Sequence, residues 1–427
     1  MALPGPGFAQ TRTTSDKVVL PFYLYASLSL IAASVLLFIS TPSFQTAHFN
    51  PGVLSVTHVM ALGWGSMMIL GASHQLVPVM IEGKLFSNFL GHVSFVLAAF
   101  GIIFLVTGFY RFEFTVLTKT GGILVLSAFV VYFINLLTSI IISKSDSLHA
   151  LFVLTATVWV VSTMTLGVLL IFNFTDHVLA NGSVYYLTLH AHMGIVGWFL
   201  MTIMGVGTRL IPMFMISKYT SAKRMWWMYG LVNGALLMFV FSYILKPSVI
   251  IYNISIVMVI IAIIIFMQYC YLAWKSRIRK KVDPQVKISI FSSVVMLVPA
   301  IIILIVLTLS QLSVYYERLI LIYGFCIFFG WISDIIFGMT FKTLPFILWR
   351  KKFQKKAGKG STPNPKDLFS QQIFRWMLGT YFTGFILFVA GIIFSGGVFF
   401  KAGAALLVVV SLLFNWNVIN MLRFKKE

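Results

Sequence analysis

Long apolar runs alternate with short polar connections along almost the whole chain. Each run has about 20 residues or more, which is the length that an α-helix needs to cross the hydrocarbon core of a bilayer. The pattern therefore predicts an all-α integral membrane protein with twelve transmembrane helices. The predicted helices cover residues 18–40, 51–80, 87–109, 120–143, 148–174, 184–216, 222–245, 248–274, 287–310, 314–347, 370–394 and 397–421.

The second and sixth predicted helices share a pattern at an offset of 134 residues. Eight positions are identical without a gap: His58, Gly63, Trp64, Met67, Ile69, Gly71, Leu76 and Pro78 recur as His192, Gly197, Trp198, Met201, Ile203, Gly205, Leu210 and Pro212. The tenth predicted helix repeats part of the pattern at an offset of 133, with Gly330, Trp331, Ile336, Gly338 and Pro345. This self-similarity predicts three copies of a four-helix unit, about residues 18–143, 148–274 and 287–421, arranged as three arcs with pseudo-threefold symmetry. We expect residues 1–427 to form a single membrane domain.

Composition supports a membrane protein and suggests its orientation. Of the 427 residues, 59% are hydrophobic and 10% are charged. The net charge of +21 does not indicate a nucleic-acid partner, because the basic residues collect in short loops between apolar runs. On one side of the membrane the loops hold only five of them: Arg111, Lys119, Lys246, Arg318 and Lys401. The positive-inside rule then predicts a multi-pass protein of a bacterial-type inner membrane with both termini in the cytoplasm.

The two cysteines, Cys270 and Cys326, lie inside apolar runs, so we expect neither a disulfide nor a thiolate metal site. The sequence has no CxxCH motif, which excludes covalent attachment of a c-type haem. The N-terminal segment lacks the short apolar core and the cleavage site of a signal peptide. We therefore expect the apolar run that begins near Val18 to be a retained helix.

Two histidines, His190 and His192, stand one residue apart near the start of the sixth predicted helix. At the matching level the first repeat has Val56 and His58, and the third has Tyr323 and Phe325. Residues i and i+2 of an α-helix point about 200° apart, so His190 and His192 face opposite flanks and cannot share one compact site.

His58 and His192 occupy equivalent positions about one turn inside their helices, and we expect them to face each other. Two imidazoles opposed in this way are axial ligands of a low-spin, six-coordinate haem b. His190 would then have no histidine opposite it, and a second haem b bound there would be high-spin, with an open face for a gas. The alternative for each is a hydrogen-bonded histidine at the membrane interface. We expect surface or packing roles for the remaining histidines, His48, His74, His92, His149 and His177.

Further residues of the repeat have structural or chemical interpretations. Small residues allow a neighbouring helix or a flat macrocycle to come close, which is the role we expect of Gly63, Gly71, Gly197 and Gly205. The tryptophans Trp64, Trp198 and Trp331 are expected to pack in the core or to line pores. Asp334, in the tenth predicted helix, could carry protons, pair with Lys342 or bind a water.

The stretch HAHMGIVGWFLMTIMGVGTRLIPMF resembles the tenth helix of the haem–copper oxidase catalytic subunit, especially that of the C-family cbb-type oxidases, which are similar to nitric oxide reductases. In that family an H-x-H followed by G-x-x-G-W and L-I-P ligates both haems. The resemblance implies that His192 ligates the low-spin haem and that His190 is the proximal ligand of the high-spin haem. The stretch THVMALGWGSMMILGASHQLVPVM is similar to the family's second helix, which implies that His58 is the other low-spin ligand.

The chain departs from the family pattern in two ways that bear on its chemistry. Its H-x-H lies in the sixth predicted helix rather than in the tenth. The predicted seventh, tenth and eleventh helices contain no histidine for the family's copper-B site, so copper is not expected. Tyr323, at the ligand level of the third repeat, is the candidate catalytic residue, since it could face the open side of a haem on His190.

These patterns predict a haem b-binding membrane subunit in respiratory electron transfer, or an oxidoreductase that acts on oxygen or nitric oxide. The expected partners are the lipid bilayer, a cytochrome c-like or quinol electron donor, and other membrane subunits. One alternative is a non-catalytic haem protein for nitric oxide sensing or stress response, like the twelve-helix NnrS family. The other is a secondary transporter, which the almost wholly apolar midplane disfavours.

Overall fold

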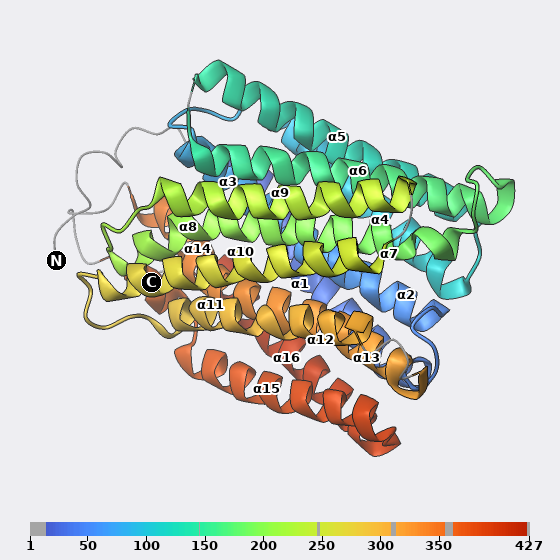
Figure 1. Ribbon diagram of the computed structural model, residues 1–427. Coiled ribbons are helices and arrows are strands. Elements are labelled where there is room, and N and C mark those ends of the chain that lie inside the picture. The colour runs from blue at the N-terminus through green and yellow to red at the C-terminus, as the bar shows by residue number, and fades with distance from the viewer. Residues whose placement is uncertain (1–13, 145, 246–247, 309–312, 355–361, 425–427) are drawn as a thin grey trace.

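A computed structural model describes residues 14–144, 146–245, 248–308, 313–354 and 362–424 (Figure 1). These residues form helices and contain no β-strand. Within the described residues, twelve helical segments are long and apolar enough to cross a membrane, which confirms the predicted all-α class with twelve spans. The α-helices are α1 (Asp16–Ile39), α2 (Pro51–His58), α3 (Met67–Met80), α4 (Asn88–Arg111), α5 (Val116–Ser143), α6 (Leu148–Asp176), α7 (Leu187–His192), α8 (Met201–Met215), α9 (Ala222–Leu245), α10 (Val249–Lys275), α11 (Pro284–Val295), α12 (Leu297–Thr308), α13 (Ser313–Phe325), α14 (Ser333–Phe353), α15 (Gln371–Phe394) and α16 (Gly397–Arg423).

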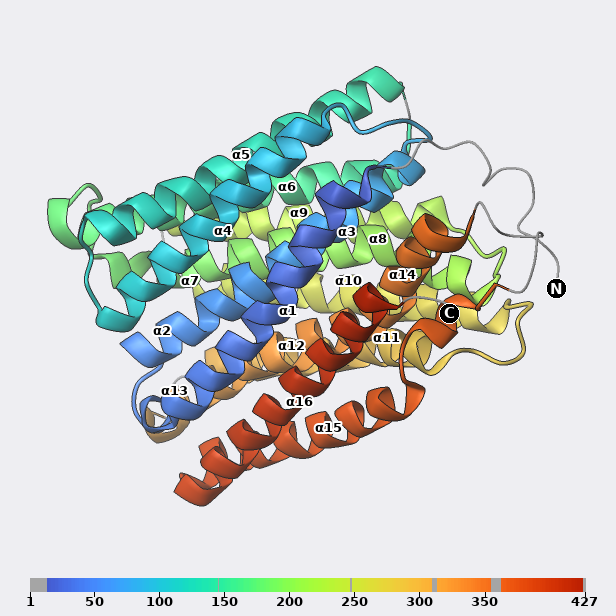
Figure 2. The ribbon, with the colours of Figure 1, turned by 180° about the vertical axis from the view of Figure 1, so that it is seen from behind.

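The spans run along one common direction in a single bundle (Figures 1 and 2). We call the end at which α1 begins and α16 ends the termini end, and the opposite end, at which α2, α7 and α13 begin, the far end. The predicted end of the ninth span, residues 309–310, lies outside the described residues.

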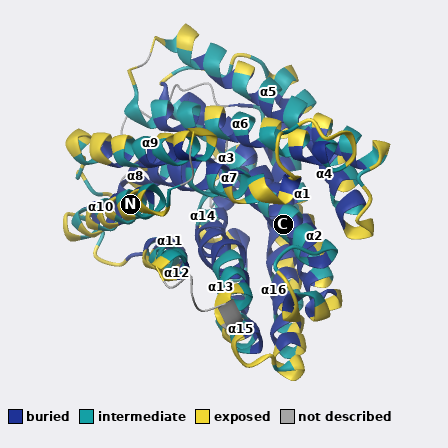
Figure 3. Ribbon diagram, turned by 45° about the vertical axis from the view of Figure 1, so that its right-hand side comes forward, coloured by how far each residue is buried: buried dark blue, intermediate teal, exposed yellow. Residues whose placement is uncertain are grey.

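Three spans form the centre of the bundle. In Pro51–Met80, Ser183–Met215 and Tyr315–Phe353, 72% of the most apolar stretch is buried, compared with 22–50% in the other nine candidate spans of the described chain. Around them α5 packs on α6, α10 on α11 and α12, and α16 returns to α1. Exposed residues gather at the loops and along the outer helices (Figure 3). The three central spans are the second, sixth and tenth, which carry the sequence repeat, whereas the pseudo-threefold axis stays a prediction.

Each central span contains a π-helical segment at the same place in the repeat. The segments are η3 (Val59–Ser66), η5 (Met193–Leu200) and η6 (Cys326–Ile332), and they begin directly after His58, His192 and Phe325. A π-helical turn shifts the helix register by one residue and commonly marks functional sites. It also frees backbone carbonyls: the Tyr381 hydroxyl donates to the carbonyl oxygens of Phe329 and Gly330 at 2.7 and 3.0 Å.

The repeated tryptophans lie within these π-helical segments and join the central spans. Trp64 Nε1 donates to Ser333 Oγ at 3.1 Å, and Trp198 Nε1 donates to Ser66 Oγ at 3.0 Å. Trp331, the third member, is also buried, but its Nε1 has no hydrogen-bond partner in the described chain. The repeat explains the difference, because the position equivalent to Ser66 and Ser333 in the sixth span is Leu200.

The start of α2 shows how the local sequence positions a site residue. Asn50 caps this helix by accepting a hydrogen bond from Val53 N at 3.0 Å, and Pro51 occupies the first turn, where its missing N–H costs nothing. The cap fixes the helix start two turns before His58, so that the imidazole lies below the far end of the bundle.

Candidate functional site

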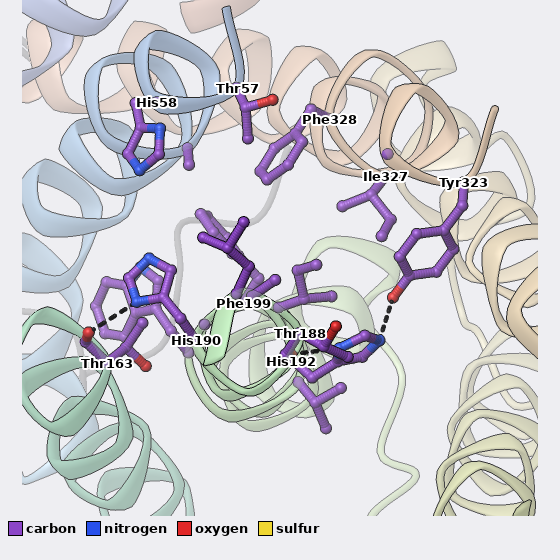
Figure 4. A pocket seen from close by; sticks show the side chains of 18 of the residues that line it. Thr57, His58, Thr163, Thr188, His190, His192, Phe199, Tyr323, Ile327 and Phe328 are labelled. Atoms are coloured by element: carbon purple, nitrogen blue, oxygen red, sulfur yellow. Dashed lines mark hydrogen bonds between the residues drawn. The ribbon is translucent and has the colours of Figure 1, made fainter. Parts of the chain in front are cut away.

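A cavity of about 750 Å³ lies between the central spans toward the far end. Its lining is mostly aliphatic and aromatic, and its polar members include His58, His190, His192 and Tyr323 (Figure 4). The volume lies within the range of about 300–1,000 Å³ that is typical of cofactor and ligand pockets. The three candidate haem-binding histidines and Tyr323 therefore line one cavity.

His58 and His190 face each other across this cavity. Their ring centroids are 6.4 Å apart and their planes are 20° from parallel. The Nδ1 atom of His58 lies 2.8 Å from the carbonyl oxygen of Leu54, and that of His190 lies 3.0 Å from the carbonyl oxygen of Thr163. A carbonyl only accepts hydrogen bonds, so each Nδ1 carries the proton and each Nε2 keeps a free lone pair.

The two free nitrogens point toward one another from α2 and α7 (Figure 4). The hydrogen bonds of His58 and His190 within the described residues are made by Nδ1 and leave each Nε2 without one. Metal-binding histidines usually donate the opposite ring N–H to a carbonyl or carboxylate, which fixes the tautomer and the ring orientation. Both rings have this arrangement.

The spacing of the rings fits one metal ion between them. With metal–imidazole distances of about 2 Å, two rings on opposite sides of one ion have centroids about 6 Å apart. The observed 6.4 Å agrees with this arrangement. Opposed imidazoles in an apolar pocket are the donor set of a six-coordinate haem.

Small and aromatic residues shape the space around the pair. A Cβ added to Gly167 of α6 would lie 2.8 Å from Cε1 of His190, so only glycine leaves the imidazole in this position. The Phe109 ring lies 4.6 Å from the His58 ring. Sequence reasoning missed both residues, because neither belongs to the repeat and contacts between α4, α6 and the central spans leave no local motif.

The predicted opposition of His58 and His192 is wrong, since the ring that faces His58 belongs to His190. The prediction that His190 and His192 point to opposite flanks is consistent with this outcome. The sequence repeat gives the depth of each histidine but not the rotation of the sixth span about its axis. That rotation turns the His190 flank toward α2 and the His192 flank toward α13 (Figure 4).

His192 pairs with Tyr323 instead. The tyrosine hydroxyl lies 3.0 Å from Nε2 of His192, and the two rings stack at 5.8 Å. Nδ1 of His192 lies 2.8 Å from the carbonyl oxygen of Thr188, so the hydroxyl is the donor to Nε2. The candidate catalytic residue Tyr323 therefore contacts His192 and not His190.

The third interface, where Phe325 replaces a histidine, is filled by aromatic rings. Phe325 stacks with Phe329, Phe385 and Phe388 at centroid distances of 4.9, 5.3 and 4.4 Å. These phenyl groups offer no ligand atom, so the two histidine-bearing interfaces hold the candidate chemistry.

The other histidines lie away from the pair. His48 lines the cavity at the far end, where its Nδ1 is 2.7 Å from Glu317 Oε2. His149 lies 3.1 Å from the carbonyl oxygen of Gly205, and His74 is buried against Phe22 and Tyr132. The described residues contain no cluster of three or more histidine, cysteine or acidic side chains placed to bind a metal ion.

The interpretation of Asp334 as a partner of Lys342 is wrong. Lys342 forms an ion pair with Asp283, which also binds Arg279 at 2.9 Å. Asp334 is 1% exposed, and neither of its carboxylate oxygens has a hydrogen-bond partner among the described residues.

Comparisons with known proteins do not add an assignment. No protein-family model matches the chain, and the search of curated proteins found no match.

Proposed function

We propose that this protein is a membrane cytochrome that binds one haem b between His58 and His190. The observation that carries the proposal is the opposition of their two imidazoles, with both Nδ1 atoms anchored on carbonyls and both Nε2 atoms turned toward each other. The resemblance of the H-x-H stretch and of the second span to haem-binding helices of the haem–copper oxidase superfamily supports the same cofactor.

The protein residues would have three tasks at this site. The carbonyls of Leu54 and Thr163 hold the two rings, and Gly167 leaves room for His190. The apolar lining of the cavity excludes water around the pair. A haem held by His58 and His190 would supply one-electron transfer.

This arrangement favours electron transfer without an open substrate position. Among the alternatives, it favours a non-catalytic haem protein over an oxygen or nitric oxide reductase at this pair. We place the site toward the outer side of an inner membrane, with both termini cytoplasmic, since the far-end loops contain few basic residues. A cytochrome c-like protein or a quinol is the proposed electron donor.

A second haem on His192 is a weaker candidate. The Tyr323 hydroxyl occupies Nε2 of His192, so iron could bind there only after the hydroxyl moves away. We therefore propose that the His192–Tyr323 pair forms a hydrogen-bonded wall of the cavity and that the protein holds one haem per chain.

The test is an optical spectrum of the purified protein in its oxidised, reduced and CO-treated reduced forms, with haem quantified per chain. We expect one haem b and a reduced spectrum that CO does not change. Two haems with a CO-sensitive fraction would support the high-spin site and a gas-reactive enzyme. A protein that binds no haem after supply of haem during expression would contradict the proposal and favour a transporter.

A further inference from the structure

Asp334 is a buried acid without a partner inside a membrane span. It belongs to the first turn of α14 and is 1% exposed. Both carboxylate oxygens are buried, and neither has a hydrogen-bond partner in the described chain. An ionised carboxylate in such surroundings would be very unfavourable, so the group is stable there only as the neutral acid.

Helix register places Asp334 between α11 and α15. One turn toward the far end, a Cβ on Gly330 would lie 3.2 Å from Phe385 and 3.8 Å from Val295. One turn toward the termini end, a Cβ on Gly338 would collide with Ser289 Oγ. Because α11 and α14 run in opposite directions, Asp334 lies at the level of Ser292, one turn beyond Ser289.

The face of α11 that packs on α14 is polar and buried. Its members recur at helical spacing and are at most 4% exposed: Gln285, Ser289, Ser292 and Ser293. We call these four residues the α11 polar stripe. The serine hydroxyls donate to carbonyls of their own helix, which leaves their oxygens able to accept a proton donor: Ser289 to Gln285, Ser292 to Ser289, and Ser293 to Ile290.

The α11 polar stripe begins at a second pocket, of about 330 Å³, at the termini end. Gln285 lines this pocket together with the ion-paired Asp283 and Lys342. Gln285 also donates to Gln371 at 3.0 Å. A polar surface therefore runs from a charged pocket near the membrane boundary to the level of Asp334.

The groups around Asp334 are less suited than its carboxyl group to exchange a proton. Tyr381 of α15 lies close enough to interact with it electrostatically, but the tyrosine hydroxyl is engaged with two backbone carbonyls. Cys326 is a neighbour of Tyr381 on the far-end side. Trp331, about one turn from Asp334, lines the histidine cavity, and its indole N–H is unpartnered.

We propose that Asp334 is a proton-carrying acid that exchanges its proton with water at the termini end through the Asp283 pocket and the α11 polar stripe. In one exchange the carboxyl group releases a proton along the stripe and takes up another from water, with no change in oxidation state. Asp334 lies about one turn from Trp331, which lines the histidine cavity. On this route, Asp334 is therefore the proton-carrying group next to that cavity.

Isotope-edited infrared spectroscopy of the full chain tests this proposal without reference to haem. Selective ¹³C labelling of the aspartate side chains restricts the signal to the six aspartates of the sequence. At neutral pH we expect a labelled band from a protonated carboxyl group. Asp334→Asn should remove this band. Asp334→Glu should also remove it from the labelled signal, because the new glutamate carries no label. Persistence of this band in both variants, or its absence from the wild-type protein, would overturn the proposal.

The route is tested by following the same band after transfer to D₂O. Ser289→Ala with Ser292→Ala removes two stripe hydroxyls, and we expect exchange to slow on the order of tenfold, because an apolar gap interrupts the path. Ser411→Ala is the matched control, since Ser411 is a buried hydroxyl of α16 away from the stripe. Equal exchange rates in the double variant and in the wild-type protein would exclude the stripe as the route.

Discussion

The imidazoles of His58 and His190 face each other at a centroid distance of 6.4 Å, although the two residues come from different repeats of the chain. Their planes differ by 20°, and each ring is held by a backbone carbonyl through Nδ1. The two unprotonated Nε2 atoms are therefore placed to share one ligand between α2 and α7. The account of this protein as a haem-binding membrane protein depends on this pair.

Gly167→Ala is expected to weaken haem binding without a change at either ligand. The new methyl group would lie 2.8 Å from Cε1 of His190, so the ring must leave its present position opposite His58. Loss of orientation around a ligating histidine commonly lowers metal affinity by about 10–100-fold. Haem titration into the protein purified without haem measures the change.

Gly230→Ala is the matched control for this variant, because a Cβ on Gly230 of α9 meets nothing within 4 Å. It should bind haem as the wild-type protein does. Equal haem affinity in Gly167→Ala and Gly230→Ala would show that the position of the His190 ring does not matter for binding.

Tyr323→Phe should leave the haem spectrum unchanged and lower stability. The substitution removes the hydroxyl that lies 3.0 Å from Nε2 of His192 and leaves that nitrogen without its partner. The expected loss is about 1 kcal/mol in the free energy of unfolding, which thermal denaturation in detergent measures. A changed axial-ligand spectrum in this variant would instead place His192 among the haem ligands.

Trp198→Phe and Trp331→Phe form a matched pair that tests the tryptophan contacts. Both side chains are buried, and both substitutions remove the same indole N–H. Trp198 donates to Ser66 at 3.0 Å, whereas Nε1 of Trp331 has no partner in the described chain. We expect Trp198→Phe to be less stable than Trp331→Phe by about 1–2 kcal/mol, measured as the difference in unfolding free energy. Equal losses would mean that packing volume alone determines the stability at both positions.

The sequence pattern predicted much of this architecture because its signals are local. Apolar runs located the twelve spans. The eight identical positions shared by the second and sixth spans identified central helices of the bundle. The π-helical segments recur at the same offsets of 134 and 133 residues, beginning at Val59, Met193 and Cys326. Equal sequence therefore produced equal local structure, and the depth of His58, His190 and His192 followed from it.

The pairing of the histidines was not predictable from the same pattern. Opposite flanks of the sixth span both carry an imidazole, and rotation of that span about its axis depends on packing with α6, α9 and α13. The Asp283–Lys342 ion pair was missed for a similar reason, since Asp283 lies in a connection whose path depends on the helices it joins. Gly167 had no signal, because a single glycine within a membrane helix is common.

The most direct measurement compares the reduced optical spectra and haem content of His58→Ala, His190→Ala and His192→Ala, purified in parallel with the wild-type protein. His192→Ala is the matched control, since it removes an imidazole from the same helix on the opposite flank. We expect the six-coordinate spectrum to disappear in His58→Ala and in His190→Ala, with haem content lowered or the remaining haem reactive toward CO, and to persist in His192→Ala. Loss of that spectrum in His58→Ala and His192→Ala, with His190→Ala unaffected, would contradict the account.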